Sequence, residues 1–199
     1  MDLVHFYHRG ISYSEYTDLF QKAVEEGSTS GPVQTEEYVF YTKLNWKRFH
    51  RLAQHTVLSE PPFSADTSRF SHLAALCITE FWCGDAAQNI PVIQQLVDRY
   101  FGFPIRYVFR DENLQLMDAY LTNGGRSIPK YVLFDLQTGE EKATWGPRPQ
   151  NIQEVVNALK ESGMSKEIMM EEVQKAYNSD KSLSVQQEWF ALLHTFNQL

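Results

Sequence analysis

One short stretch of the chain, TEFWCGDAAQNIP (Thr79 to Pro91), carries a residue type suited to nucleophilic chemistry. Cys83 follows an apolar run that predicts a strand, and the residues after it predict a helix. A thiolate at the N-terminus of a helix faces unpaired backbone N–H groups and the positive end of the helix dipole. Both favour the charged form, so cysteines placed in this way can have a pKa well below the free value of about 8.5. The position of Cys83 therefore predicts a reactive thiol.

Two neighbouring residues work against this chemistry. Ala86 stands three residues after Cys83, where a redox protein would carry a second thiol, so a mixed disulfide on Cys83 cannot be released from within the motif. The carboxylate of Asp85 beside the thiol should raise the thiol pKa. Cys83 is therefore expected to act alone, with an external thiol releasing any mixed disulfide.

The composition narrows the class of protein. With 199 residues, 43% of them hydrophobic and 22% charged, the chain matches an ordinary globular protein. A net charge of −7 disfavours nucleic acid as a partner. No apolar run approaches the ~18–20 residues needed to span a membrane, and the N-terminus does not resemble a secretory signal. We therefore expect a cytoplasmic protein without nucleic-acid or membrane partners.

The other candidate chemistries find little support. Cys77 and Cys83 lie six residues apart, which along an extended strand is roughly 20 Å and too far for a disulfide. Cys77 lies between Leu76 and Ile78 and is expected in the core. The six histidines show no zinc-binding spacing, and the chain contains neither a glycine-rich nucleotide motif nor a G-x-S-x-G motif. We expect no metal and no cofactor.

Apolar periodicity and turn residues predict the elements that position Cys83. Ser12 and Glu15 form a capping box that begins a helix, and Gly27 ends it. Asp111 is expected to cap a short helix, and Ser184 with Gln187 to form a second capping box. Further helices are expected at about 37–54, 85–101, 112–121, 151–162, 166–178 and 184–199, and strands at 73–82, 105–110, 128–135 and 141–146.

The order of these elements predicts an α/β fold. Strands separated by helices imply parallel pairing, and the hairpin formed by the last two strands adds an antiparallel pair at one edge. We divide the chain into an N-terminal helical extension (1–62), a central α/β domain (63–162) and a C-terminal helical extension (163–199). The three parts are expected to form one compact unit.

Four features together resemble the thioredoxin-fold family over roughly residues 70–160. WCG ends the first buried strand and opens a helix, and Pro91 lies eight residues after Cys83, where thioredoxins kink that helix. SIPKYVLF resembles the segment whose proline is cis, which here is Pro129, and TGEEKATWGP resembles the terminal hairpin. WCGDAAQ in place of WCGPC, with added helices, is similar to a divergent bacterial group. The resemblance implies a thioredoxin-like mixed sheet with a parallel core.

The resemblance also implies a site. The Ile128–Pro129 bond would be cis and face Cys83, with backbone free to pair with an extended substrate. Cys77 stands where thioredoxins bury an acid, so Glu80 is the nearest replacement, and Arg126 either approaches Cys83 or remains exposed in solvent. The residues expected around the thiol are Trp82, Gly84, Asp85, Ala86, Ile128 and Pro129.

Three functions remain open. The leading hypothesis is a monothiol thiol–disulfide oxidoreductase acting through Cys83 on a protein or small-molecule thiol or disulfide, with an external reducing thiol. The alternative is a redox-inactive peptide-binding or protein-binding module. A glutathione-dependent thiol transferase would need a basic or amide-rich pocket that the sequence does not clearly show. The oligomeric state cannot be read from the residues.

Overall fold

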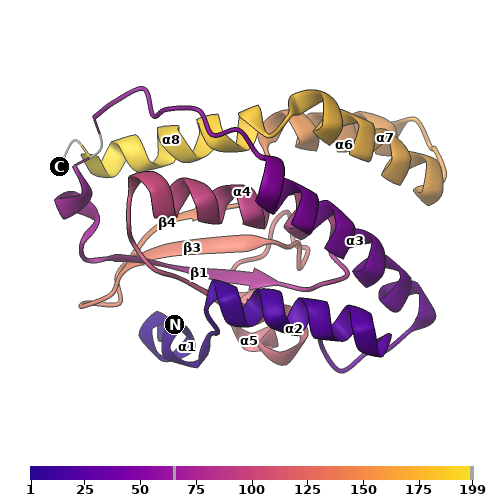
Figure 1. The fold of residues 1–199 in the computed structure, drawn as a ribbon, viewed down its shortest axis with the longest axis horizontal. Coiled ribbons are helices and arrows are strands. Elements are labelled where there is room, and N and C mark those ends of the chain that lie inside the picture. The colour runs from indigo at the N-terminus through magenta and orange to yellow at the C-terminus, as the bar shows by residue number, and fades with distance from the viewer. Residues whose placement is uncertain (65, 198–199) are drawn as a thin grey trace.

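A four-stranded sheet with helices on both faces forms the centre of the computed structural model, which describes residues 1–64 and 66–197 (Figure 1). The strands are β1 (Leu73–Thr79), β2 (Ile105–Phe109), β3 (Lys130–Asp135) and β4 (Glu141–Trp145). The helices are α1 (Leu3–Arg9), α2 (Tyr13–Glu26), α3 (Glu36–His55), α4 (Gly84–Tyr100), α5 (Leu114–Asp118), α6 (Gln150–Glu161), α7 (Lys166–Asp180) and α8 (Leu183–Asn197). Short 3-10 turns occupy Thr67–Phe70 and Arg110–Glu112.

The sheet is mixed, as predicted, but only one of its pairs is parallel. The strand order is β2-β1-β3-β4, with β1 parallel to β2 and antiparallel to β3, and with β3 antiparallel to β4. The expectation that all helix-separated strands pair in parallel is therefore wrong for β3. The five residues of α5 span only about 7.5 Å, so the chain that leaves β2 does not return to the far end of the sheet before β3 begins.

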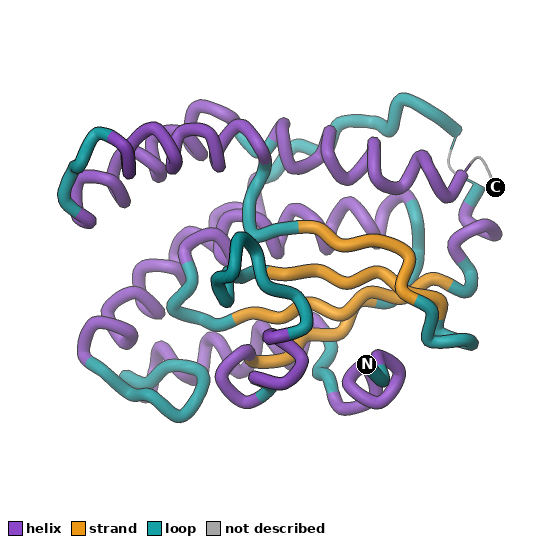
Figure 2. Tube along the Cα trace, turned by 180° about the vertical axis from the view of Figure 1, so that it is seen from behind, coloured by secondary structure: helices purple, strands orange, loops and turns teal. Residues whose placement is uncertain are grey.

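Helices cover both faces of the sheet, which explains why all seven residues of β1 are buried. On one face, Trp189 of α8 meets Tyr131 of β3 at 5.0 Å between ring centroids, and the Tyr107 hydroxyl donates to Gln94 of α4. On the other face, Tyr7 of α1 packs edge-on against Phe134. Figure 2 shows the strands side by side from the opposite direction.

Two local predictions are wrong and one is confirmed. Ser12 and Glu15 form the capping box that begins α2. Asp111 does not cap a helix, because it lies in a 3-10 turn and α5 begins at Leu114. The second capping box is also absent, because α8 begins at Leu183 and the Ser184 hydroxyl, inside the helix, donates to Asp180. Two residues of the predicted last helix, 198–199, lie outside the described residues.

The helices from both ends of the chain meet at the N-terminus of α4. Helix α3 packs along α4, and α8 packs on α4 farther along (Figure 1). Helix α7 reaches the first turn of α4 through a hydrogen bond from the Tyr177 hydroxyl to Asp85. Within the described residues, no helix has the length and apolar character needed to cross a membrane.

Gly146, just after β4, has the least room for a side chain. Its φ is +112°, and a Cβ added there would lie 2.2 Å from the Pro129 carbonyl oxygen. We predict that Gly146→Ala lowers the free energy of unfolding by about 3 kcal/mol or more, because backbone strain and overpacking add. Urea denaturation measures the loss. Gly163→Ala is the matched control, because Gly163 also has a positive φ (+69°) but nothing within 4 Å. Equal losses in the two variants would contradict the overpacking explanation.

Candidate functional site

The Cys83 thiol joins the start of α4 to the loop before β3. Cys83 is the N-cap residue of α4, and its Sγ accepts the Ala86 backbone N–H at 3.4 Å. The same thiol donates to the Ile128 carbonyl oxygen at 3.2 Å. The Ile128–Pro129 peptide bond is cis in the structure. The fold thus brings Cys83, Ala86 and Ile128 into contact, although Ile128 is 45 residues away in the sequence.

Burial controls the protonation of Cys83. The residue is 8% exposed, and burial, reinforced by the nearby Asp85 carboxylate, raises the pKa of the thiol to about 12. The Ala86 N–H and the Arg148 guanidinium act in the opposite direction and are outweighed. In this structure desolvation therefore exceeds the effect of the helix N-terminus. The thiol is protonated at neutral pH, which suits its role as a donor to Ile128.

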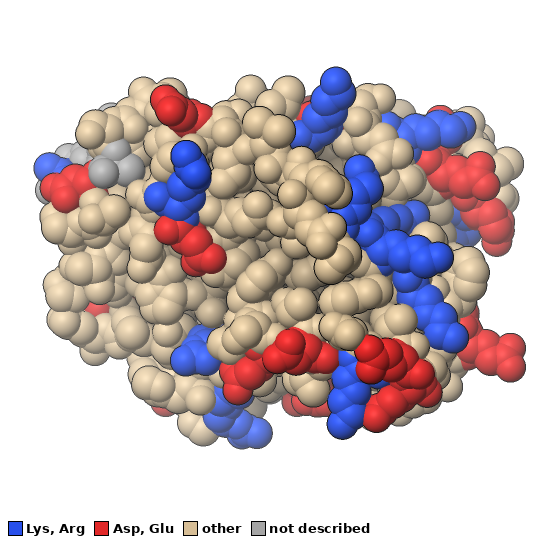
Figure 3. Space-filling model, in the orientation of Figure 1, with Lys and Arg blue, Asp and Glu red and all other residues tan. Residues whose placement is uncertain are grey.

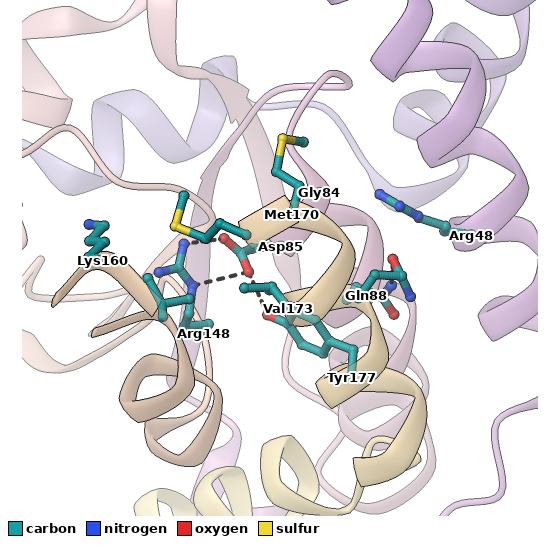
Figure 4. Close-up of a pocket in the computed structure, with 12 residues that line it drawn as sticks. Arg48, Gly84, Asp85, Gln88, Arg148, Lys160, Met170, Val173 and Tyr177 are labelled. Atoms are coloured by element: carbon teal, nitrogen blue, oxygen red, sulfur yellow. Dashed lines mark hydrogen bonds and ion pairs between the residues drawn. The ribbon is translucent and has the colours of Figure 1, made fainter. Parts of the chain in front are cut away.

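Asp85 is held by two side chains that the sequence analysis did not select. The Arg148 guanidinium binds both carboxylate oxygens, with Nε at 3.1 Å and Nη2 at 2.5 Å, and the Tyr177 hydroxyl donates to one of them at 2.6 Å (Figure 4). Asn89 in turn donates to the Tyr177 hydroxyl at 3.1 Å. The sequence offers little local signal for either residue: Arg148 lies between two prolines, and Tyr177 lies in a predicted helix.

Trp82 is half-buried and makes most of its contacts inside the molecule. Its ring stacks on Tyr38 of α3, with centroids 4.6 Å apart and planes at 11°. The Arg110 guanidinium lies 4.7 Å from the same ring. Trp82 therefore links the N-terminal helical segment to the site, and part of its surface is already covered.

Glu80 is fully buried and faces a different loop from Cys83. Its carboxylate accepts the Ser30 hydroxyl and, at 2.9 Å, the Asp111 backbone N–H. Ser30 also accepts the Phe81 backbone N–H at 2.9 Å, so the group ties the loop before α3 to the end of β1. Burial raises the pKa of Glu80 to about 7, against the lowering effect of these hydrogen bonds.

The remaining candidates lie away from the thiol chemistry. Cys77 is fully buried, and burial raises the pKa of its thiol well above the usual value. Arg126 is exposed and binds Asp118 through two hydrogen bonds of 2.6 and 2.9 Å. Gly84 begins α4 next to the Arg48 guanidinium. Within residues 1–64 and 66–197, no cluster of three or more His, Cys, Asp or Glu side chains could hold a metal ion.

Comparisons with known proteins agree with this architecture. A family model described as Thioredoxin matches residues 31–161. A crystal structure of an HIV epitope scaffold is 14% identical, with a TM-score of 0.53 over 93% of this chain and 99% of its own. A protein of unknown function from Pseudomonas aeruginosa has the same identity and TM-score, over 93% of this chain and 98% of its own. At this identity both structures show the fold alone. No curated protein matches the chain.

We predict that Glu80 makes the protein less stable as the pH rises from about 4.5 to about 7. Its pKa in the folded state is raised to about 7 from a usual value of 4.5, so the folded state binds more protons in this window. The shift corresponds to roughly 3 kcal/mol of unfolding free energy. In urea denaturation between pH 5 and 8, Glu80→Gln should lose less stability than the wild type. Glu112→Gln, at an exposed position, is the matched control for loss of a carboxylate, and equal slopes in wild type and Glu80→Gln would refute the assignment.

Proposed function

Because the chain belongs to the thioredoxin family, we propose that it is a redox-inactive thioredoxin-fold module that binds an extended peptide without a covalent bond. The main observation behind this proposal is that the Cys83 thiol is buried and donates a hydrogen bond to the Ile128 carbonyl oxygen. A nucleophilic cysteine needs the thiolate, and a pKa near 12 leaves very little of it at neutral pH.

The surroundings of Cys83 support the same conclusion. Ala86 supplies no second thiol, and Cys77 is fully buried in β1. The Asp85 carboxylate forms an ion pair with Arg148. It is therefore not available as a general base for the thiol. Among the described residues, the hydrogen-bond partners of the Cys83 sulfur are the Ile128 carbonyl and the Ala86 N–H, and neither is suited to take its proton.

The backbone next to Pro129 supports peptide binding. Among the described residues, the Ile128 backbone N–H has no hydrogen-bond partner, while the Ile128 carbonyl is occupied by Cys83. A buried backbone N–H without a partner costs free energy, and the carbonyl of an extended peptide would satisfy it. Ser127, which precedes it, is half-buried.

Monothiol oxidoreductase activity is the second candidate. The Ala86 N–H reaches the Cys83 sulfur, and Arg148 lowers the thiol pKa, so both would stabilise a thiolate once it formed. The thiolate would attack one sulfur of a disulfide, the S–S bond would break, and the leaving thiolate would take up a proton. An external thiol would then release the mixed disulfide on Cys83.

Alkylation separates the two candidates. With Cys83 as the single thiol in Cys77→Ala, we predict that iodoacetamide reacts at pH 7 at least about 100-fold more slowly than with glutathione, because so little thiolate exists. The rate should still be rising at pH 10, and oxidised glutathione should leave no adduct detectable by mass spectrometry. Protein unfolded in urea is the control and should react at the ordinary rate. A plateau below pH 8.5 together with a glutathione adduct would establish the monothiol activity instead.

Peptide binding is tested with sequences selected from a random phage-displayed library. We predict that a selected peptide shifts the Ile128 amide resonance in ¹⁵N-labelled protein, because that N–H gains a partner. Cys83→Ser, which keeps a hydroxyl donor toward Ile128, should bind within about twofold of wild type because no covalent step is involved. Failure to select any peptide, or shifts confined to distant amides, would reject the module.

A further inference from the structure

A cavity of about 220 Å³ opens beside the N-terminus of α4 (Figure 4). Helix α3 contributes Arg48 to its wall, the first turns of α4 contribute Gly84, Asp85 and Gln88, and α6 and α7 form the opposite side. Neither Cys83 nor Ile128 lines it. The cavity therefore lies outside the site proposed for peptide binding.

Among the residues that the structure describes, no carboxylate pairs with Arg48, which reaches this cavity. The side chain is half-buried, and its hydrogen bond runs to the neutral Asn45 Oδ1 at 3.1 Å. Burial, with a smaller contribution from Arg51, lowers the pKa of the guanidinium. A half-buried cation without an anionic partner loses part of its hydration and gains no ion pair in return. The arrangement thus leaves a position beside Arg48 that an anion would fill.

The other charges of the cavity do not balance Arg48. Asp85 is the one carboxylate in the lining, and Arg148 already binds both of its oxygens. Lys160 of α6 adds a further positive charge, with no ion pair in the part of the chain that the structure describes. In Figure 3, basic side chains gather over α3, and toward α6 and α7 basic and acidic side chains are mixed, on a chain that as a whole carries −7. This local potential attracts anions.

The opposite wall is apolar and only partly covered. Met169, Met170 and Val173 of α7 line the cavity, together with Val156 of α6. These three α7 side chains are half-buried, whereas Tyr177 is the one buried residue of that helix. Methionine side chains adapt to ligands of irregular shape.

Two contacts hold α7 against α3. The Tyr41 hydroxyl meets the Met170 sulfur at 3.4 Å, and Lys166 pairs with Glu37 at 2.8 Å. The cavity is thus a bounded space between two helices, with a cationic side and an apolar side.

We propose that this cavity binds a small amphipathic carboxylate, with the carboxylate at Arg48 and the apolar part against Met169, Met170 and Val173. Guanidinium groups match carboxylates through paired hydrogen bonds. An apolar cavity of about 150 Å³ holds benzene, so the larger volume here admits a chain or ring with a carboxylate attached. A folded protein segment would not fit within this volume, which favours a small molecule.

The test uses octanoate as the probe and octanol as its uncharged counterpart. The chain has five methionines, two of which line the cavity, so ¹³C-methyl methionine labelling reports on the site directly. We predict saturable shifts of the Met169 and Met170 methyl signals with octanoate, and at least about tenfold weaker binding of octanol because it lacks the charge. The signal of Met117, buried elsewhere in the core, should remain unchanged and serves as an internal control.

Arg48→Met should weaken octanoate binding about tenfold and bring it close to that of octanol. Lys47→Met is the matched control, because Lys47 is exposed on the same helix and is absent from the lining. If Arg48→Met proves unfolded by circular dichroism, Lys160→Met tests the same charge effect from the α6 side.

Three outcomes would overturn the proposal: no shift at Met169 and Met170, equal binding of octanol and octanoate, or unchanged octanoate affinity in folded Arg48→Met. None of them bears on peptide binding, because Cys83 and Ile128 lie outside the cavity.

Discussion

The carboxylate of Asp85 connects three parts of the chain that are far apart in the sequence. It joins the first turn of α4 to Arg148, 63 residues away, and to Tyr177, 92 residues away. Removing one partner of a buried ion pair leaves an uncompensated charge, which typically costs about 3–5 kcal/mol. The position of α7, the course of the loop after β4 and the environment of the Cys83 thiol all depend on this group.

Two titratable residues, Glu80 and Cys83, lie between β1 and α4, and burial raises the pKa of both side chains. Cys83 stays a thiol that donates to Ile128, and Glu80 changes its charge near neutral pH while it holds Ser30 and Asp111. The helices outside the central α/β segment contribute to this burial, since Tyr38 of α3 covers Trp82 and α7 reaches Asp85. A motif associated with redox chemistry thus occupies surroundings that suppress the charged thiolate.

Local signals in the sequence were enough to predict the elements, but not the contacts between distant ones. The capping box at Ser12 and the order of strands and helices could be read directly, because each depends on a few neighbouring residues. The direction of β3 depends on how far the short α5 carries the chain, which residue types do not reveal. The contacts of Arg148 and Tyr177 could not be predicted, because their common partner, Asp85, lies far away in the sequence. The protonation of Cys83 depends on the burial of its side chain, which cannot be predicted from the motif around it.

Tyr177 is the one buried residue of α7, and polar contacts, such as Gln88 with Gln174 and Lys166 with Glu37, join this helix to α3 and α4. Separation of this helix from its neighbours would therefore expose little apolar surface to water. Separation of β1 would expose much more, because every residue of β1 is buried. The amide hydrogens of α7 should exchange with solvent through local opening, at a lower free-energy cost than those of the sheet. Such local opening of α7 would give the space between α3 and α7 an entrance while the sheet stays intact.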